Sequence, residues 1–149
     1  MGEKLEEHII IHRNGFDHLE EVYRLNRLIF GEDRLINRLD HDPLLFLTAH
    51  CEGQLAGFKI GYALNRNIFY SAKGATAPLF RKRGIATQLL FAMISDAMEL
   101  GFREMQYDTF PRLYPGMTIL GLRNGFRIRR MGWNEEYNDF QMRLGRIIR

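Results

Sequence analysis

Hydrophobic residues recur along this chain with two different periods, one typical of strands and the other typical of helices. Short runs rich in β-branched and aromatic residues, bounded by Gly, Asn, Asp or Pro, predict strands. We expect such strands at residues 8–13, 44–52, 54–64, 68–77, 104–110, 125–133 and 140–144. The Glu52-Gly53 pair joins the second strand to the third, which predicts a β-hairpin.

Helical spacing of apolar residues predicts helices in the intervening segments. They cover residues 16–30, 33–39, 84–100 and 115–124. The apolar face of the longest one consists of Ile85, Leu89, Met93, Ala97 and Leu100. Gly101 ends that helix, and Pro115 begins the next one at a position where its missing N–H costs little.

The order of these elements predicts an α/β fold with a mixed sheet. It runs strand, two helices, three antiparallel strands, helix, strand, helix and two strands. No repeat or long linker divides the sequence, so we expect a single domain over residues 1–149. Hydrophobic residues make up 46% of the chain and charged residues 26%, which is ordinary for a globular domain.

The segment 76–86 carries the clearest chemical signal, because it joins a predicted strand to the longest predicted helix. The first amides of a helix lack partners and the helix dipole favours negative charge, so such a turn binds anions. Gly84 allows the backbone to come close to a phosphate. Arg81, Lys82 and Arg83 add positive charge at the same corner. The segment therefore predicts a cradle for a pyrophosphate.

Residues 81–86, Arg-Lys-Arg-Gly-Ile-Ala, resemble the acyl-CoA motif of the GCN5-related N-acetyltransferases, Arg/Gln-x-x-Gly-x-Gly/Ala. Pro78 precedes the motif, and the order of elements is similar to that family over nearly the whole chain. The resemblance implies an acyl-CoA N-acyltransferase fold, a twisted sheet of about seven strands with about four helices on both faces. It also implies transfer of an acetyl group from acetyl-CoA to an amine acceptor, with a catalytically impaired acyl-CoA-binding regulator as the alternative.

The resemblance further assigns residues to acetyl-CoA. In the family, the strands corresponding to 68–77 and 104–110 splay apart, and the pantetheine arm bonds to the backbone of the first. The implied pantetheine contacts are Gly74, Ala75 and Thr76. The implied diphosphate contacts are Arg81, Lys82, Arg83, Gly84, Ile85, Ala86 and Thr87.

The sequence also departs from the family pattern. Lys82 stands where many members have Gly. The Tyr thought to protonate the departing CoA thiolate corresponds here to Gly121, and an Asn at the start of that helix corresponds to Tyr114. Either the Tyr114 phenol supplies the acid from the helix start, or Tyr114 only packs beside the neighbouring prolines.

Acidic and phenolic residues lie where the family places its acceptor. We expect Glu32 to bind a cationic acceptor and to serve as a candidate base, or else to stabilise the start of the predicted helix 33–39. Tyr70 and Tyr107 are the further candidates for substrate binding, and their neighbours Ser71 and Asp108 lie on the same strands. Strand alternation turns one member of each pair inward. The weaker candidate bases are His41 and His50.

Several classes of function are disfavoured. Cys51 is the only cysteine and none of the five histidines shows a metal-binding spacing, so we expect no metal site and no acyl-enzyme. The net charge is +3, and the arginines of the last strands alternate with apolar residues, as on the solvated face of a strand. This pattern disfavours nucleic-acid binding as the function.

The location and assembly of the chain follow from similar signals. The charged N-terminal residues do not form a signal peptide, and no apolar run reaches membrane-spanning length. We therefore expect a cytoplasmic protein without membrane contact. The apolar residues Trp133, Tyr137 and Phe140 on the last strands are compatible with a homodimer.

Overall fold

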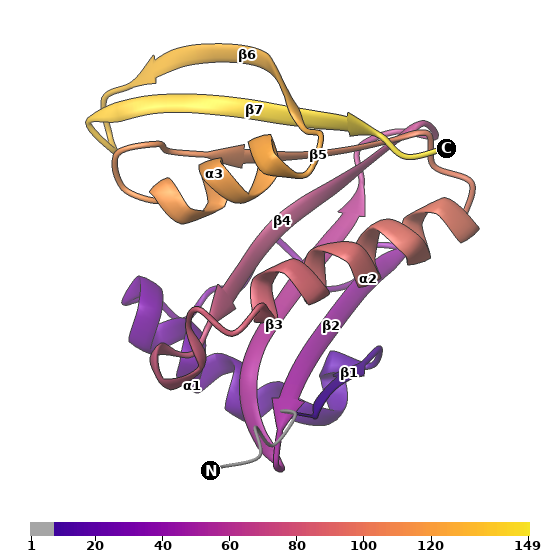
Figure 1. Ribbon diagram of the computed structural model, residues 1–149, viewed down its shortest axis with the longest axis vertical. Coiled ribbons are helices and arrows are strands. Elements are labelled where there is room, and N and C mark those ends of the chain that lie inside the picture. The colour runs from indigo at the N-terminus through magenta and orange to yellow at the C-terminus, as the bar shows by residue number, and fades with distance from the viewer. Residues whose placement is uncertain (1–7) are drawn as a thin grey trace, which may run out of the picture.

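The computed structural model describes residues 8–149, and residues 1–7, which carry the signal-peptide argument, lie outside the described part. Seven strands form one sheet in the order β1-β2-β3-β4-β5-β7-β6 (Figure 1). The strands are β1 (Ile9–His12), β2 (Leu44–Cys51), β3 (Gln54–Ala63), β4 (Ile68–Thr76), β5 (Glu104–Thr109), β6 (Arg127–Asn134) and β7 (Asp139–Ile147). The helices are α1 (Leu19–Phe30), α2 (Ile85–Glu99) and α3 (Pro115–Arg123), with 3-10 turns at Gly15–His18 and Pro78–Phe80.

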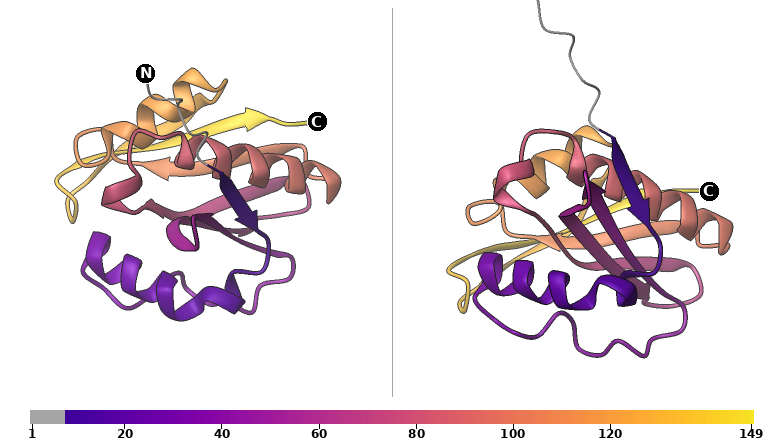
Figure 2. Two further views of the ribbon diagram at one scale, coloured as in Figure 1. Left: turned by 60° about the horizontal axis from the view of Figure 1, so that its bottom comes forward. Right: turned by 90° about the horizontal axis from the view of Figure 1, so that it is seen from below.

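The helices cover both faces of the sheet, as Figure 2 shows. On one face, Val22 and Leu25 of α1 pack with Phe46, Phe58 and Ile60 of the sheet. On the other face, α2 packs into a larger core that residues of α3 also contact. The mixed sheet with helices on both faces confirms the predicted fold class.

One predicted helix is wrong. Residues 33–39 form no helix, because other groups bind the carbonyls that a helix would use. The buried Asn26 side chain donates to the carbonyls of Glu32 and Arg34, at 2.8 and 3.2 Å, and Lys73 Nζ donates to the latter at 2.8 Å. Leu35 is buried in the core below. The segment is thus an anchored loop, and β7 is longer than the predicted strand 140–144.

Helix α3 lies against β5 through an unusually close approach. The Tyr107 hydroxyl of β5 donates to the Met117 carbonyl of α3 at 2.7 Å. A Cβ added at Gly121 would lie 2.0 Å from that hydroxyl and 2.9 Å from Leu144 Cδ1. Glycine at 121 is therefore a packing requirement: it makes room for the phenol of Tyr107.

We expect Gly121→Ala to destabilise the fold by about 1–3 kcal/mol, because the added methyl overpacks α3 against Tyr107. Urea denaturation measures this free energy of unfolding. Gly116→Ala on the same helix is the matched control, since a Cβ there meets no atom within 4 Å among the described residues, and alanine favours the helix. Equal effects of the two substitutions would contradict the packing argument.

Candidate active site

The central opening of the molecule lies where β4 and β5 separate. These strands are the parallel pair of the sheet, and they pair only from Ile68↔Glu104 to Tyr70↔Gln106. Beyond that point the two strands no longer pair with each other, and they diverge as Figure 1 shows. A cavity of about 1170 Å³ occupies this region and reaches from the start of α2 to the α1–β2 loop. The predicted splay of the two strands is confirmed.

One end of the cavity is the N-terminus of α2. Gly84 is the N-cap residue of this helix and has a φ of +81°, and Lys82 also has a positive φ of 62°. Within residues 8–149, no side chain caps this helix and its first turn carries no acidic residue. A Cβ built at Gly84 meets no described atom within 4 Å. The geometry fits a phosphate group, since the uncapped amides face open space beside basic side chains.

Most of the predicted site residues line this one cavity. They are Glu32, Tyr70, Gly74, Ala75, Thr76, Arg81, Lys82, Gly84, Ile85, Ala86, Thr87, Tyr107 and Tyr114. Arg83 is the exception: its guanidinium lies 5.4 Å from the centroid of the Phe80 ring and borders a different, smaller cavity. Folding thus gathers residues that are separated by more than eighty positions.

A β-bulge marks the wall of the cavity formed by β4. The pairing with β3 passes from Ile60↔Lys73 to Gly61↔Ser71, which leaves Ala72 as the extra residue. Bulges redirect the backbone and are common beside active sites. The edge of β4 that faces β5 has no strand partner after Tyr70 in the described structure. Its backbone groups are therefore free to bond an extended ligand.

Glu32 reaches the cavity from the α1–β2 loop, but it is not an isolated carboxylate. Lys73 Nζ lies 2.7 Å from Glu32 Oε1 and 4.4 Å from the centroid of the Phe30 ring. The hydrogen bond from Lys73 and its charge lower the pKa of Glu32. A carboxylate held in this way is a weak base, although its exposed half can still contact a cationic group.

Tyr70 and Asp108 belong to a second paired network, on the facing walls formed by β4 and β5. The Tyr70 hydroxyl donates to Asp108 Oδ2 at 2.8 Å, and Arg143 of β7 binds both carboxylate oxygens at 2.7–2.8 Å. Burial favours the neutral acid, but the hydrogen bonds from Arg143 and Tyr70 outweigh it and lower the pKa of Asp108. Burial and the Asp108 charge raise the pKa of Tyr70. Asp108 is therefore an anchor rather than an available base.

The two remaining tyrosines differ in accessibility. Tyr107 is only 3% exposed and its hydroxyl is engaged with α3, so it forms a wall of the cavity. Tyr114 is 39% exposed at the start of α3, with its ring 6.4 Å from that of Phe30. Asp139 fixes the loop before it by accepting hydrogen bonds from the amides of Arg112 and Leu113, at 2.8 and 3.1 Å.

Lys59 is a residue of this cavity that the sequence reasoning missed. It lies on β3 opposite Gly74, is 4% exposed, and holds its Nζ 5.9 Å from the centroid of the Tyr107 ring. Burial lowers the pKa of its amine to about 8. The one sequence signal was its place between Phe58 and Ile60, within an otherwise apolar strand.

The structure also locates the predicted cysteine, the two candidate histidines and the arginines of the last strands. Cys51 is buried on β2, in agreement with an inert thiol. Neither His41, which stacks on Tyr62 with ring centroids 3.9 Å apart, nor His50 lines the cavity. On the last strands, Arg129 and Arg143 form ion pairs with Glu104 and Asp108 of β5, which leaves fewer charges for a nucleic-acid surface.

We expect Lys59→Met to raise the free energy of unfolding at pH 7 by about 3 kcal/mol, because it removes a buried positive charge. Burial lowers the pKa of the Lys59 amine from 10.5 to about 8, which measures the cost of that charge. Between pH 8 and 10.5 the unfolded chain binds the proton more tightly, so wild-type stability rises with pH and the advantage of Met shrinks. Urea denaturation at pH 7 and pH 10 measures both effects.

Lys73→Met is the matched control, because it removes a partnered lysine and leaves Glu32 without its ion pair. We expect this variant to lose stability. A loss of stability in Lys59→Met at pH 7 would contradict the assignment of Lys59 as an uncompensated buried amine.

Comparison with known proteins agrees with this geometry. The family model described as Acetyltransferase (GNAT) domain matches residues 30–109. Ard1 from Thermoplasma volcanium is similar in structure, with a TM-score of 0.80 and 19% identity over 95% of this chain and 98% of that one. The ribosomal-protein-S18-alanine N-acetyltransferase from Escherichia coli has a TM-score of 0.80 and 13% identity, over 95% of this chain and 94% of the other.

A third similar structure is a GNAT family acetyltransferase from Elizabethkingia anophelis with acetyl-CoA bound. Its TM-score is 0.69, with 19% identity over 93% of this chain and 97% of that one. No curated protein sequence matches significantly. Within the described residues, no helix is long and apolar enough to cross a membrane. The family match covers more than half of the sequence, and this chain belongs to the GNAT acetyltransferase family.

Proposed function

We propose that this protein is an acetyl-CoA-dependent N-acyltransferase in which an acceptor amine attacks the thioester directly, within a ternary complex. The observation that carries the proposal is one continuous cavity, which joins the uncapped N-terminus of α2 to the unpaired edge of β4. The first of these features suits a diphosphate and the second suits an extended amide-bearing arm.

The donor would lie along residues already placed in the cavity. The amides of residues 82–87 would bind the diphosphate, with Arg81 and Lys82 supplying positive charge. The backbone of Gly74, Ala75 and Thr76 would bond the pantetheine arm. When bound, acetyl-CoA supplies a thioester carbonyl as electrophile and a thiolate as leaving group.

The chain itself would supply two catalytic contributions. A backbone N–H of β4 near the bulge at Ala72 would donate to the thioester oxygen and stabilise its developing charge. Tyr114, half-exposed at the start of α3, would give its phenolic proton to the departing sulfur, and the amine, which attacks in its neutral form, would return a proton to the phenolate. Gly121 cannot be the site of this acid, because the Tyr107 hydroxyl occupies the space beside it.

The acceptor end combines aromatic side chains with one accessible carboxylate. Glu32 would bind a cationic amine, while Tyr70 and Tyr107 would form the walls of the acceptor pocket. The ion pair with Lys73 favours binding over base catalysis for Glu32, because its lowered pKa makes it a poor proton acceptor. Its role as base stays a prediction, as do the identity of the amine and the length of the acyl group.

Two predictions about the whole protein accompany this proposal. The exposed apolar side chains Ile128, Met131 and Trp133 on the edge strand β6 are compatible with a homodimer. A cytoplasmic location agrees with a cofactor of central metabolism and is part of the proposal. The alternative function, an acyl-CoA-binding regulator, keeps the cradle and differs only in the absence of transfer.

We expect the wild-type protein to bind acetyl-CoA in calorimetry, and an Arg81→Glu/Gly84→Glu variant to bind at least about tenfold more weakly. The new carboxylates would repel the diphosphate and fill the cradle. Arg66→Glu/Gly53→Glu is the matched control: it makes the same charge change and strains a glycine of similar φ, +78°, outside the cavity. Absence of wild-type binding near millimolar concentration would overturn both the enzyme and the regulator.

We expect Tyr114→Phe to lower kcat for acetyl transfer by about 100-fold while acetyl-CoA binding is unchanged, since only proton donation is lost. Thiol release with a panel of small amines and peptides measures transfer. Tyr137→Phe, another exposed phenol of the same cavity, is the control and should keep its activity. Wild-type binding without release with any amine would favour the regulator.

A further inference from the structure

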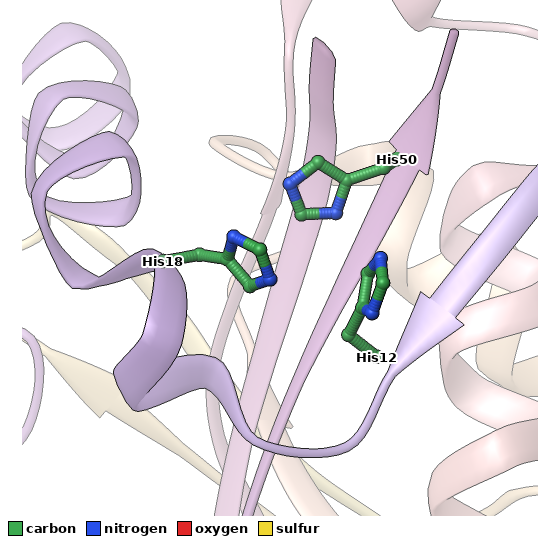
Figure 3. Close-up of side chains that lie close together, drawn as sticks. All are labelled: His12, His18 and His50. Atoms are coloured by element: carbon green, nitrogen blue, oxygen red, sulfur yellow. The ribbon is translucent and has the colours of Figure 1, made fainter. Parts of the chain in front are cut away.

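Three histidines that lie far apart in the sequence meet at the opposite end of α1 from the cavity. His12 ends β1, His18 ends the 3-10 turn before α1, and His50 lies near the end of β2 (Figure 3). Each offers a ring nitrogen, and these three nitrogens lie within 4.8 Å of one another. It is the one such group of metal-ligating side chains found in residues 8–149.

The environment of His50 distinguishes this cluster from a chance surface grouping. His50 is 6% exposed, yet neither of its ring nitrogens has a hydrogen-bond partner in the described structure. Buried polar atoms almost always have hydrogen-bond partners, so the His50 ring lacks a partner that its burial would normally require. Glu21 of α1 lies 3.4 Å from His50 Nε2, which is an ion-pair distance rather than a well-formed hydrogen bond.

The three imidazole rings also lie close together. The ring centroids lie 4.9 Å apart for His12 and His18, 4.9 Å for His12 and His50, and 4.4 Å for His18 and His50. Three charged rings at such distances would repel one another. Burial, and next the charge of His18, lowers the pKa of His50.

We propose that His12, His18 and His50 form a binding site for a divalent transition-metal ion, with Zn²⁺ as the favoured ion. Imidazole nitrogen is a preferred ligand of zinc, and three histidines with an open fourth position form a recognised coordination set. Nitrogens around a tetrahedral zinc lie about 3.4 Å apart, so small rotations of the side chains would complete the geometry. The Glu21 carboxylate is placed to orient His50 or to enter the fourth position.

The position of the site indicates a structural role. It ties the edge strand β1 and the start of α1 to β2, three elements that the ion would hold together. None of the three histidines lines the acyl-CoA cavity, and the twelve residues of α1 separate the two regions by about 18 Å. The inference is therefore independent of the proposed transferase activity.

The test uses the full chain without an affinity tag, freed of metal by chelation. Calorimetric titration with ZnCl₂ should show one equivalent bound, and bound Co²⁺ should show the visible absorption of a tetrahedral site. His12→Ala and His18→Ala, both on the accessible side of the cluster, should weaken zinc binding at least about tenfold, the loss of one ligand. His8→Ala is the matched control, because His8 lies outside the cluster and should keep wild-type affinity.

Thermal unfolding gives a second readout that does not depend on activity. Zinc should raise the Tm of the wild type and of His8→Ala, but not that of His12→Ala or His18→Ala. Circular dichroism of the metal-free variants checks that they are folded. Substoichiometric binding by the wild type, or equal binding by the His12, His18 and His8 variants, would overturn the proposal.

Discussion

The functional architecture of this protein depends on how little β4 and β5 pair. Three residue pairs hold the parallel strands together, from Ile68↔Glu104 to Tyr70↔Gln106, and beyond them the sheet opens. Unpaired backbone groups next to a cavity would carry a large penalty unless solvent or a ligand satisfied them. In this fold the unpaired backbone groups lie where the uncapped start of α2 faces the same space. The interruption of the sheet thereby places an unpaired strand edge beside an uncapped helix N-terminus, the two features on which the proposed binding of acetyl-CoA depends.

Ion pairs around the opening determine which charged side chains remain available to a ligand. Lys73 of β4 engages Glu32 of the α1–β2 loop, and Arg143 of β7 engages Asp108 on the wall formed by β5. The first pair joins β4 to the α1–β2 loop, and the second joins register partners on the neighbouring strands β5 and β7, so both carboxylates are engaged. Within residues 8–149, Lys59 has no ion-pair partner, and it lines the cavity with its amine buried beside Tyr107. The basic side chains beside the start of α2 are therefore accessible, while the acidic side chains of the cavity are largely neutralised by ion pairs.

The sequence predicted those features that depend on local chemistry. Residues 81–87 are an example, because the glycine with positive φ, the basic neighbours and the following helix lie within a single segment. Their binding of a diphosphate stays a prediction. The predicted helix 33–39 failed because Asn26 and Lys73 bind its carbonyls, and both residues lie outside the segment. Lys59 and the histidine cluster were missed for the same reason. Burial of an amine and the meeting of His12, His18 and His50 are products of tertiary packing, which no spacing along the chain reveals.

The missing family tyrosine has a physical explanation in the same terms. A side chain at Gly121 would enter the space that the Tyr107 hydroxyl fills, and that hydroxyl is held by the Met117 carbonyl. Tyr107 and Gly121 are therefore one packing unit: a phenol from β5 takes the room that a side chain of α3 would need. Tyr107 is buried, and this burial raises the pKa of its hydroxyl, so Tyr107 is a poor proton donor for a ligand in the cavity. A phenolic acid for the proposed reaction would therefore come from elsewhere, and Tyr114 is the half-exposed tyrosine at the start of the same helix.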